Sequence, residues 1–120
     1  MLDFYNGTQG SNRMKLGIVL TSHSAETNWN ALRLANLSLV NGDEIKIFLM
    51  GEGVEYAKTG TEKFNINQQI DKLTQHPKFA IYACGTCLKL RNDSGSDTCP
   101  LSTLQDLYEV IAWADKVLTF

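Results

Sequence analysis

Short runs of apolar residues alternate along the chain with longer segments in which apolar residues recur every three or four positions. Runs of the first kind are typical of strands buried on both faces, and the periodic segments are typical of amphipathic helices. Strands that alternate with helices are joined by right-handed crossovers, which predicts a mostly parallel sheet covered on both faces. We therefore expect an α/β fold, a small flavodoxin-like or Rossmann-like three-layer sandwich with four to five strands. The candidate strands are 15–20, 45–50, 79–83 and 116–120.

Three segments have helical periodicity, and each carries a signal for where the helix begins or ends. Ser24 has the side chain of an N-cap for the first, and Asn41-Gly42 should end it with a left-handed residue. Pro77 ends the second, and Ser102 with Gln105 has the spacing of a capping box for the third. The expected apolar faces are Trp29, Leu32, Ala35 and Leu39; Ile66, Ile70 and Leu73; and Leu104, Leu107, Tyr108, Ile111 and Ala112.

Composition suits a single globular domain. The 120 residues are 43% hydrophobic and 20% charged, and a chain of this size can bury about two thirds of its unfolded surface without disulfides or a structural metal. Residues 1–13 mix Gly, Asn, Ser and Thr without periodicity, so we expect a flexible extension followed by one domain over 14–120.

The charge and hydropathy of the chain exclude some classes of binding partner. The net charge is -2 and the basic residues are scattered singly, so direct nucleic-acid binding is not expected. No apolar stretch approaches the roughly 18 residues that span a bilayer, and the N-terminus lacks the apolar core of a signal peptide. We expect no membrane partner and a cytoplasmic location.

The candidate chemistry lies where the third strand ends. In parallel sheets ligands bind beyond the carboxyl ends of the strands, and Cys84 is expected there, just before a helical turn at 88–91. Unpaired N–H groups at a helix start should lower the pKa of this thiol. Gly85 would let the backbone approach whatever the sulfur carries, and Lys89 and Arg91 would add positive potential if they point towards this edge.

The cysteines admit several interpretations. Cys84, Cys87 and Cys99 are odd in number in a compartment that keeps thiols reduced, which argues against a disulfide scaffold. Cys84 and Cys87 are either reactive or small buried hydrophobic residues. Cys99, in a polar loop, is either a bystander or a mobile resolving thiol.

Three known cysteine chemistries fit the pattern less well. A thioredoxin-like dithiol also follows a strand, but the order of strands and helices here differs from that fold. Zinc would need Cys84, Cys87 and Cys99 with His76 or His23, although structural zinc sites normally use two knuckle-like pairs. A tyrosine-phosphatase loop fails on spacing, because Arg91 does not lie six residues after either cysteine. We therefore expect no metal and no cofactor.

Two other features carry less weight. His23, beyond the first strand, is either a base or ligand at this edge or a solvated side chain. The segment 51–53 (Gly-Glu-Gly) lacks the remaining glycine and the context of a dinucleotide fingerprint and is interpreted as a turn. Gly85, Thr86 and His23 are the candidate substrate-binding residues beside the candidate catalytic pair.

Three stretches resemble the DsrE/DsrF-like family, which also holds the TusD-type sulfur-relay subunits, and in particular its small YchN-like branch. They are NALRLANLSLVNGDEIKIFLMGEGVEYA, IYACGTCLKLR and WADKVLTF, and the resemblance covers nearly all of 15–120. In the family, the cysteine at the end of this strand accepts a sulfane sulfur as a persulfide and passes it to a partner. The resemblance assigns that role to Cys84 and gives Cys87 a weaker claim. It also implies a homo-oligomer, a trimer or hexamer, with sulfur donor and acceptor proteins as partners.

Two functions follow as hypotheses. The first is a sulfur carrier or sulfurtransferase in which Cys84 takes up the sulfur and Cys87 resolves or releases it. The second is a non-catalytic oligomeric binding or redox-sensing module in which the C-x-x-C dithiol only packs or senses redox state.

Overall fold

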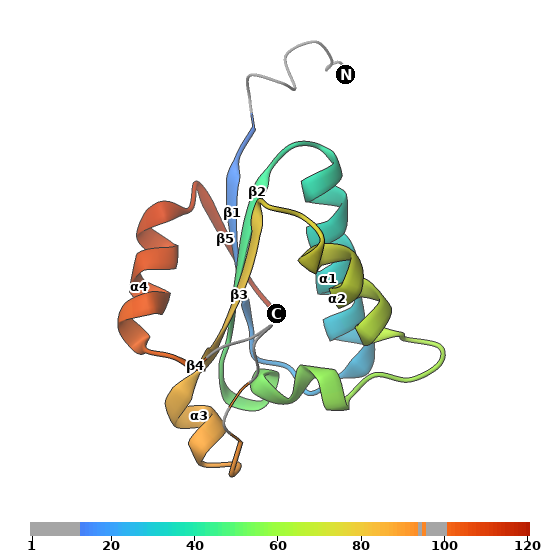
Figure 1. Cartoon of the computed structure of the whole chain (residues 1–120), viewed down its shortest axis with the longest axis vertical. Helices are drawn as coiled ribbons and strands as arrows, with labels where there is room; N and C mark the ends of the chain where they lie inside the picture. The colour runs from blue at the N-terminus through green and yellow to red at the C-terminus, as the bar shows by residue number, and fades with distance from the viewer. Residues whose placement is uncertain (1–12, 94, 96–100) are drawn as a thin grey trace.

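A five-stranded sheet forms the centre of the molecule, and all its strand pairs are parallel, in the order β4-β3-β2-β1-β5 (Figure 1). The computed structural model describes residues 13–93, 95 and 101–120. The strands are β1 (Lys15–Leu20), β2 (Glu44–Leu49), β3 (Phe79–Cys84), β4 (Leu101–Ser102) and β5 (Lys116–Thr119). This confirms the predicted α/β class. The expected flexible extension falls almost entirely outside the described residues and stays a prediction.

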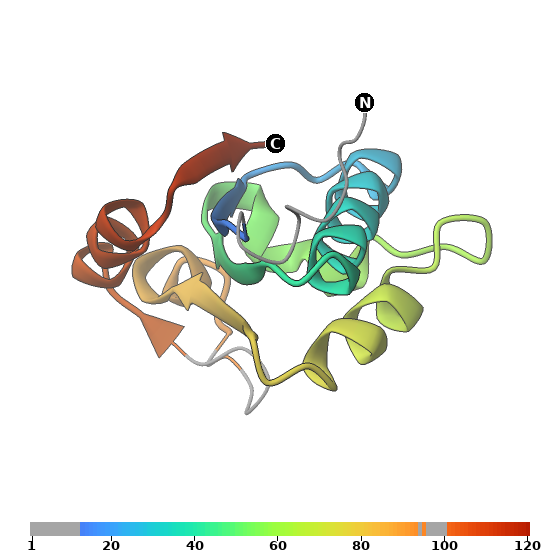
Figure 2. The ribbon, with the colours of Figure 1, turned by 90° about the horizontal axis from the view of Figure 1, so that it is seen from above.

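Helices cover both faces of this sheet, as Figures 1 and 2 show. The helices are α1 (Ala25–Val40), the 3-10 helix η2 (Gly51–Lys58), α2 (Ile66–Thr74), α3 (Gly85–Lys89) and α4 (Leu104–Trp113). The chain moves outward from β1 through β2 and β3 to β4, and then α4 returns it to β5 on the far side of β1. Because right-handed crossovers in opposite directions place their helices on opposite faces, α1 and α2 cover one face and α4 the other.

The main core lies between the sheet and the α1 and α2 helices. The predicted faces of these two helices are confirmed: Leu32, Ala35, Leu39, Ile66 and Leu73 are almost fully buried there, with Ile70 close behind. Ser24 is the N-cap of α1, where its side chain accepts the Thr27 N–H, and Gly42 has the left-handed φ of 95° that the end of the helix required. Trp29 is half-buried, and its ring lies 5.4 Å from that of Phe64.

Helix α4 departs from the prediction in two ways. Its buried residue is Val110, which contacts the β1 face at Gly17, whereas the predicted stripe is largely exposed, with Leu104 at 68%, Tyr108 at 65% and Ile111 at 48%. Its capping box joins Thr103 and Asp106, one residue beyond the predicted pair.

The shift in the capping box has a structural cause. Ser102, the residue expected to cap α4, belongs to β4 and pairs with Cys84. A two-residue edge strand leaves no period-two pattern in the sequence, so β4 and the helix start that it displaces were not predicted. Among the residues described, no helix has the length and apolarity to cross a membrane.

Candidate functional site

The carboxyl ends of the strands lie at the lower edge of the sheet in Figure 1, and η2 closes part of this edge. The Met50 N–H donates to the Leu20 carbonyl at 3.1 Å as the chain enters η2. A Cβ on Gly53 would overlap that same carbonyl oxygen, so only glycine fits there. The turn interpretation of 51–53 is therefore incomplete, because these residues begin a helix that covers the end of β1. What stays accessible is the end of β3 beside η2 and α3.

Cys84 is the last residue of β3 and the N-cap of α3, and it is half-buried. The helix begins at Gly85, three residues before the predicted turn, so Cys87 lies within it. Both cysteines have free thiols, and the Cys87 thiol is one of the groups that act on the pKa of Cys84.

The expectation of a lowered pKa at Cys84 is wrong. Burial raises the pKa of this thiol above its ordinary value of 9.0, and the neighbouring Cys87 thiol adds to the rise. The backbone N–H groups of Cys87 and Thr86 act in the opposite direction but do not outweigh the loss of solvation. A helix of five residues supplies too small a dipole to reverse that balance.

Cys87 has its own backbone donor. The Gly51 N–H, from the first residue of η2, points at Sγ of Cys87 at a distance of 3.2 Å. Gly51 adopts a left-handed φ of 57°, a conformation that is easily adopted only by glycine. The Arg91 guanidinium donates from Nη1 to the Cys87 carbonyl at 3.0 Å, so the backbone of this residue is held as well.

A carboxylate that the sequence analysis missed joins the loops of this edge. Glu55, in η2, lies 3.5 Å from Arg91 Nε, 3.6 Å from His23 Nε2 and 3.9 Å from Lys58 Nζ. Arg91 thus points towards this edge, a condition that the sequence left open, but Glu55 neutralises its charge. The signal available in the sequence was the position of Glu55 soon after a strand end, within a segment interpreted as a short helical piece.

The three candidate substrate-binding residues have different surroundings. A Cβ on Gly85 would lie 3.1 Å from the Ser102 carbonyl, so this glycine allows β4 to pack closely. Thr86 is exposed, and its backbone N–H is directed at the Cys84 sulfur. His23 has a side chain 54% exposed and pairs with Glu55. The structure brings all three to the edge that holds the cysteines.

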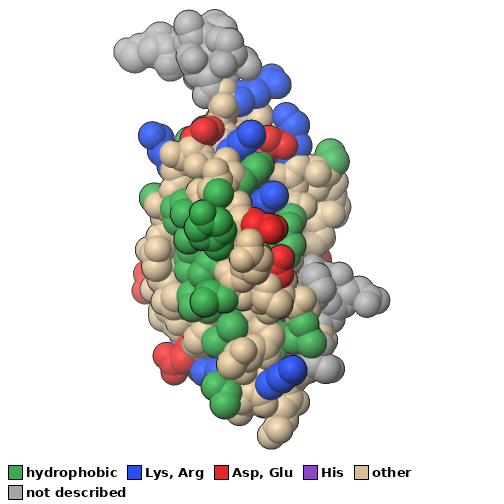
Figure 3. Space-filling model, turned by 90° about the vertical axis from the view of Figure 1, so that its left-hand side faces the viewer, with side chains coloured by type: hydrophobic (Ala, Val, Ile, Leu, Met, Phe, Trp, Pro, Cys, Tyr) green, Lys and Arg blue, Asp and Glu red, His purple; other side chains and the backbone are tan. Residues whose placement is uncertain are grey.

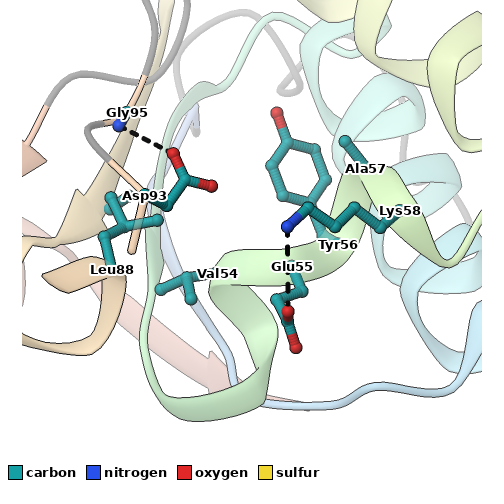
Figure 4. Close-up of a pocket in the computed structure, with 9 residues that line it drawn as sticks. Val54, Glu55, Tyr56, Ala57, Lys58, Leu88, Asp93 and Gly95 are labelled. Carbon is teal, nitrogen blue, oxygen red and sulfur yellow. Dashed lines mark hydrogen bonds and ion pairs between the residues drawn. The ribbon is translucent and has the colours of Figure 1, made fainter. Parts of the chain in front are cut away.

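A pocket of about 180 Å³ lies between η2, β3 and α3 (Figure 4). Val54 and Tyr56 of η2, Ala83 of β3 and Leu88 of α3 line it, and the Lys58 to Glu55 ion pair and Asp93 border it. Because successive strand residues point to opposite faces, Ala83 faces this pocket while Cys84 faces away. Neither Cys84 nor Cys87 lines this pocket.

The zinc alternative loses one of its ligands. The backbone carbonyl of His76 accepts the Phe79 N–H, which places His76 at the amino end of β3, at the opposite edge of the sheet from Cys84. Within 13–93, 95 and 101–120, no group of three or more His, Cys, Asp or Glu residues lies together. Cys99 falls outside these residues.

The fold and this edge define a small parallel α/β domain that places two free thiols at the end of a central strand. A family model described as the DsrE/DsrF-like family matches residues 14–120. The chain belongs to this family, which the sequence resemblance had indicated, and it is thereby a member of a sulfur-relay family.

Individual relatives agree with this placement. The chain is 33% identical over 103 residues to an uncharacterised protein of Methanopyrus kandleri, which spans 82% of this chain and 85% of the relative. It is 29% identical over 114 residues to an uncharacterised protein of Methanocaldococcus jannaschii, spanning 89% of this chain and 100% of the relative. The crystal structure of the YchN protein from E. coli superposes with a TM-score of 0.75 and 30% identity, covering 88% of this chain and 98% of that one.

Proposed function

We propose that this chain carries sulfane sulfur as a persulfide on Cys84. The observation that carries the proposal is the position of this cysteine, half-buried at the end of β3 with two backbone N–H groups directed at its sulfur. Hydrogen bonds from N–H groups stabilise an anionic sulfur, whether thiolate or persulfide. Family membership supports the same chemistry.

The uptake step is a thiolate exchange. The Cys84 thiolate attacks the outer sulfur of a donor persulfide, a new sulfur–sulfur bond forms at Cys84, and the donor leaves as its thiolate. The raised pKa of Cys84 keeps the thiolate fraction small at neutral pH. The same raised pKa makes each thiolate that forms more nucleophilic. Thr86 contributes its backbone N–H, Gly85 allows β4 to pack against the start of α3, and His23 places an imidazole on the same edge.

Loading with a sulfane-sulfur donor tests this proposal. After reaction with inorganic polysulfide, intact-mass measurement should show a gain of about 32 Da, one sulfur atom, whenever the persulfide is retained. Cys87→Ser should load, and Cys84→Ser should not. Undiminished loading of Cys84→Ser would exclude Cys84 as the carrier, and Cys99→Ser controls for the third thiol.

We also propose that the chain works as a homo-oligomer, a trimer or hexamer, and exchanges sulfur with donor and acceptor proteins. The exposed apolar side chains of α4 support a subunit contact, and Figure 3 shows apolar side chains gathered on the side of the molecule where α4 lies. Persulfide chemistry needs thiols that stay reduced, so we propose a cytoplasmic location.

One observation favours a second candidate, the binding or redox-sensing module. A thiol whose pKa is raised reacts slowly at neutral pH, as a packed cysteine does. The loading assay separates the two functions: a module of this kind would take up no sulfur on Cys84, and its dithiol would respond only to oxidants.

A further inference from the structure

The two thiols occupy the pair of helix positions whose side chains meet. Cys84 is the N-cap of α3 and Cys87 is the third residue of the helix, the same relation that brings the two side chains of a capping box together. The Cys87 thiol and the Cys87 backbone N–H both act on the pKa of Cys84, as groups beside that sulfur do. A sulfur atom carried by Cys84 is therefore bonded to an atom that Cys87 Sγ can reach.

Cys87 is held in place for a role of its own. The Gly51 N–H lies 3.2 Å from Cys87 Sγ, and the Arg91 guanidinium lies 3.0 Å from the Cys87 carbonyl oxygen. A backbone N–H stabilises negative charge on the atom it faces. The donor comes from η2, a different element from the one that supports Cys84. The Gly51 N–H would therefore stabilise a thiolate on Cys87.

We propose, on the basis of the function proposed above, that Cys87 discharges the Cys84 persulfide as hydrosulfide, so that the domain reduces sulfane sulfur to sulfide. The Cys87 thiolate attacks Sγ of Cys84, the Cys84–Cys87 disulfide forms, and the bond between Sγ and the outer sulfur breaks. The outer sulfur leaves as hydrosulfide with the persulfide proton. The sulfane sulfur gains two electrons, and the two cysteine sulfurs together lose two.

The direction of attack follows from the leaving groups. Attack on the outer sulfur would move the persulfide to Cys87 and expel the Cys84 thiolate, whereas attack on Sγ expels hydrosulfide. The weaker base leaves faster in such exchanges. Burial raises the pKa of Cys84, which makes its thiolate the poorer leaving group, and hydrosulfide is the conjugate base of a stronger acid than an alkyl thiol.

The cycle closes with a dithiol reductant. Thiol–disulfide exchange with an external dithiol restores both cysteines and oxidises the dithiol to its own disulfide. The overall reaction converts one sulfane sulfur and one dithiol into one hydrosulfide and one disulfide. The partner class implied is therefore a small or protein dithiol, in addition to the sulfur donor.

The test uses the full reduced chain, inorganic polysulfide as the probe and anaerobic conditions. Wild type should release roughly one equivalent of sulfide more than Cys87→Ser and should end about 2 Da lighter than the reduced chain, while Cys87→Ser and Cys87→Ala retain a gain of about 32 Da. Peptide mapping should find the Cys84–Cys87 link, and dithiothreitol should restore the starting mass. Cys99→Ser should behave as wild type.

Different results separate the two proposals. Wild type that retains the added sulfur on Cys84 without excess sulfide would overturn the discharge step and leave the carrier function standing. Loss of sulfide release in Cys99→Ser would assign the resolving role to Cys99 and also overturn it. If neither wild type nor Cys87→Ser gains or processes sulfur at Cys84, both proposals fail.

Discussion

At the scale of single residues, the balance between burial and hydrogen bonding decides how Cys84 behaves. The folded chain holds the Cys84 proton more tightly than the unfolded chain, because burial disfavours the thiolate more than two N–H groups favour it. The contribution of this group to stability is therefore fully present below its ordinary pKa of 9.0 and is lost as pH rises through the higher folded value.

We expect a matching pH dependence in alkylation. Iodoacetamide should modify Cys84 more slowly at pH 7 than it modifies a cysteine in an unstructured peptide, and the rate should still be rising above pH 9, because only the thiolate reacts. Peptide mapping at each pH gives the rate for Cys84 alone, with the urea-unfolded chain as control. A plateau below pH 8 would show that the thiol is acidic in the folded chain and contradict this assignment.

Gly53 and Gly51 allow a matched comparison of two glycine requirements in one element. Gly53→Ala would place a methyl group against the Leu20 carbonyl, a backbone atom that cannot move aside, and should cost about 3 kcal/mol of unfolding free energy. Gly51→Ala has open space around the new methyl group. It should lose only about 1 kcal/mol of unfolding free energy, because alanine is strained at the left-handed φ of this position. Urea denaturation measures both. Equal losses would contradict the steric argument.

The predictability of the site differs from one residue to another. Cys84 could be placed because an apolar run leads directly into it and strand ends share an edge. The direction of its pKa shift could not be predicted, because it depends on packing and on the Cys87 thiol. Glu55 and the Gly51 N–H were missed for a related reason, since each contacts a partner at least 32 residues away in sequence. Local patterns do not encode such distant contacts.

At the scale of elements, hydrophobic periodicity gave the correct buried face for α1 and α2 but not for α4. Periodicity shows that a helix has an apolar stripe, not which surface meets it. Val110 packs α4 against the sheet, whereas the stripe of Leu104, Tyr108 and Ile111 points outward. A helix on the far face of the sheet can leave such a stripe for a contact outside the chain.

The start of α4 gives a direct test of the observed capping. Thr103→Ala removes the side chain that accepts the Asp106 N–H and should lower the free energy of unfolding by about 1 kcal/mol. Gln105→Ala, at the position the sequence pattern favoured, alters an exposed contact with Glu109 and should change stability by less than about 0.5 kcal/mol. Urea titrations of both variants show which pair of residues forms the capping box. A larger loss for Gln105→Ala would restore the capping box one residue earlier.

At the scale of the whole molecule, several large apolar side chains are exposed on one side. Leu90, Leu101, Leu104, Tyr108 and Ile111 are all exposed, and four of them belong to β4 and α4, on the side seen in Figure 3. The edge strand β5 is also exposed along its length. Contiguous apolar surface and an open strand edge are features that proteins usually cover with a partner.

A subunit contact through α4 would depend on Ile111, at the C-terminal end of the exposed stripe, so Ile111→Glu should convert the proposed oligomer to monomer. A charge buried in an apolar interface costs several kcal/mol, enough to reverse association of a small contact. Leu37→Glu, on the outer surface of α1 with the wild-type side chain 57% exposed, is the matched control and should leave the assembly intact. Sedimentation velocity distinguishes a trimer or hexamer from a monomer. If Leu37→Glu dissociates the protein and Ile111→Glu does not, the contact lies on the α1 side, and the exposed stripe of α4 must serve a sulfur donor or acceptor instead.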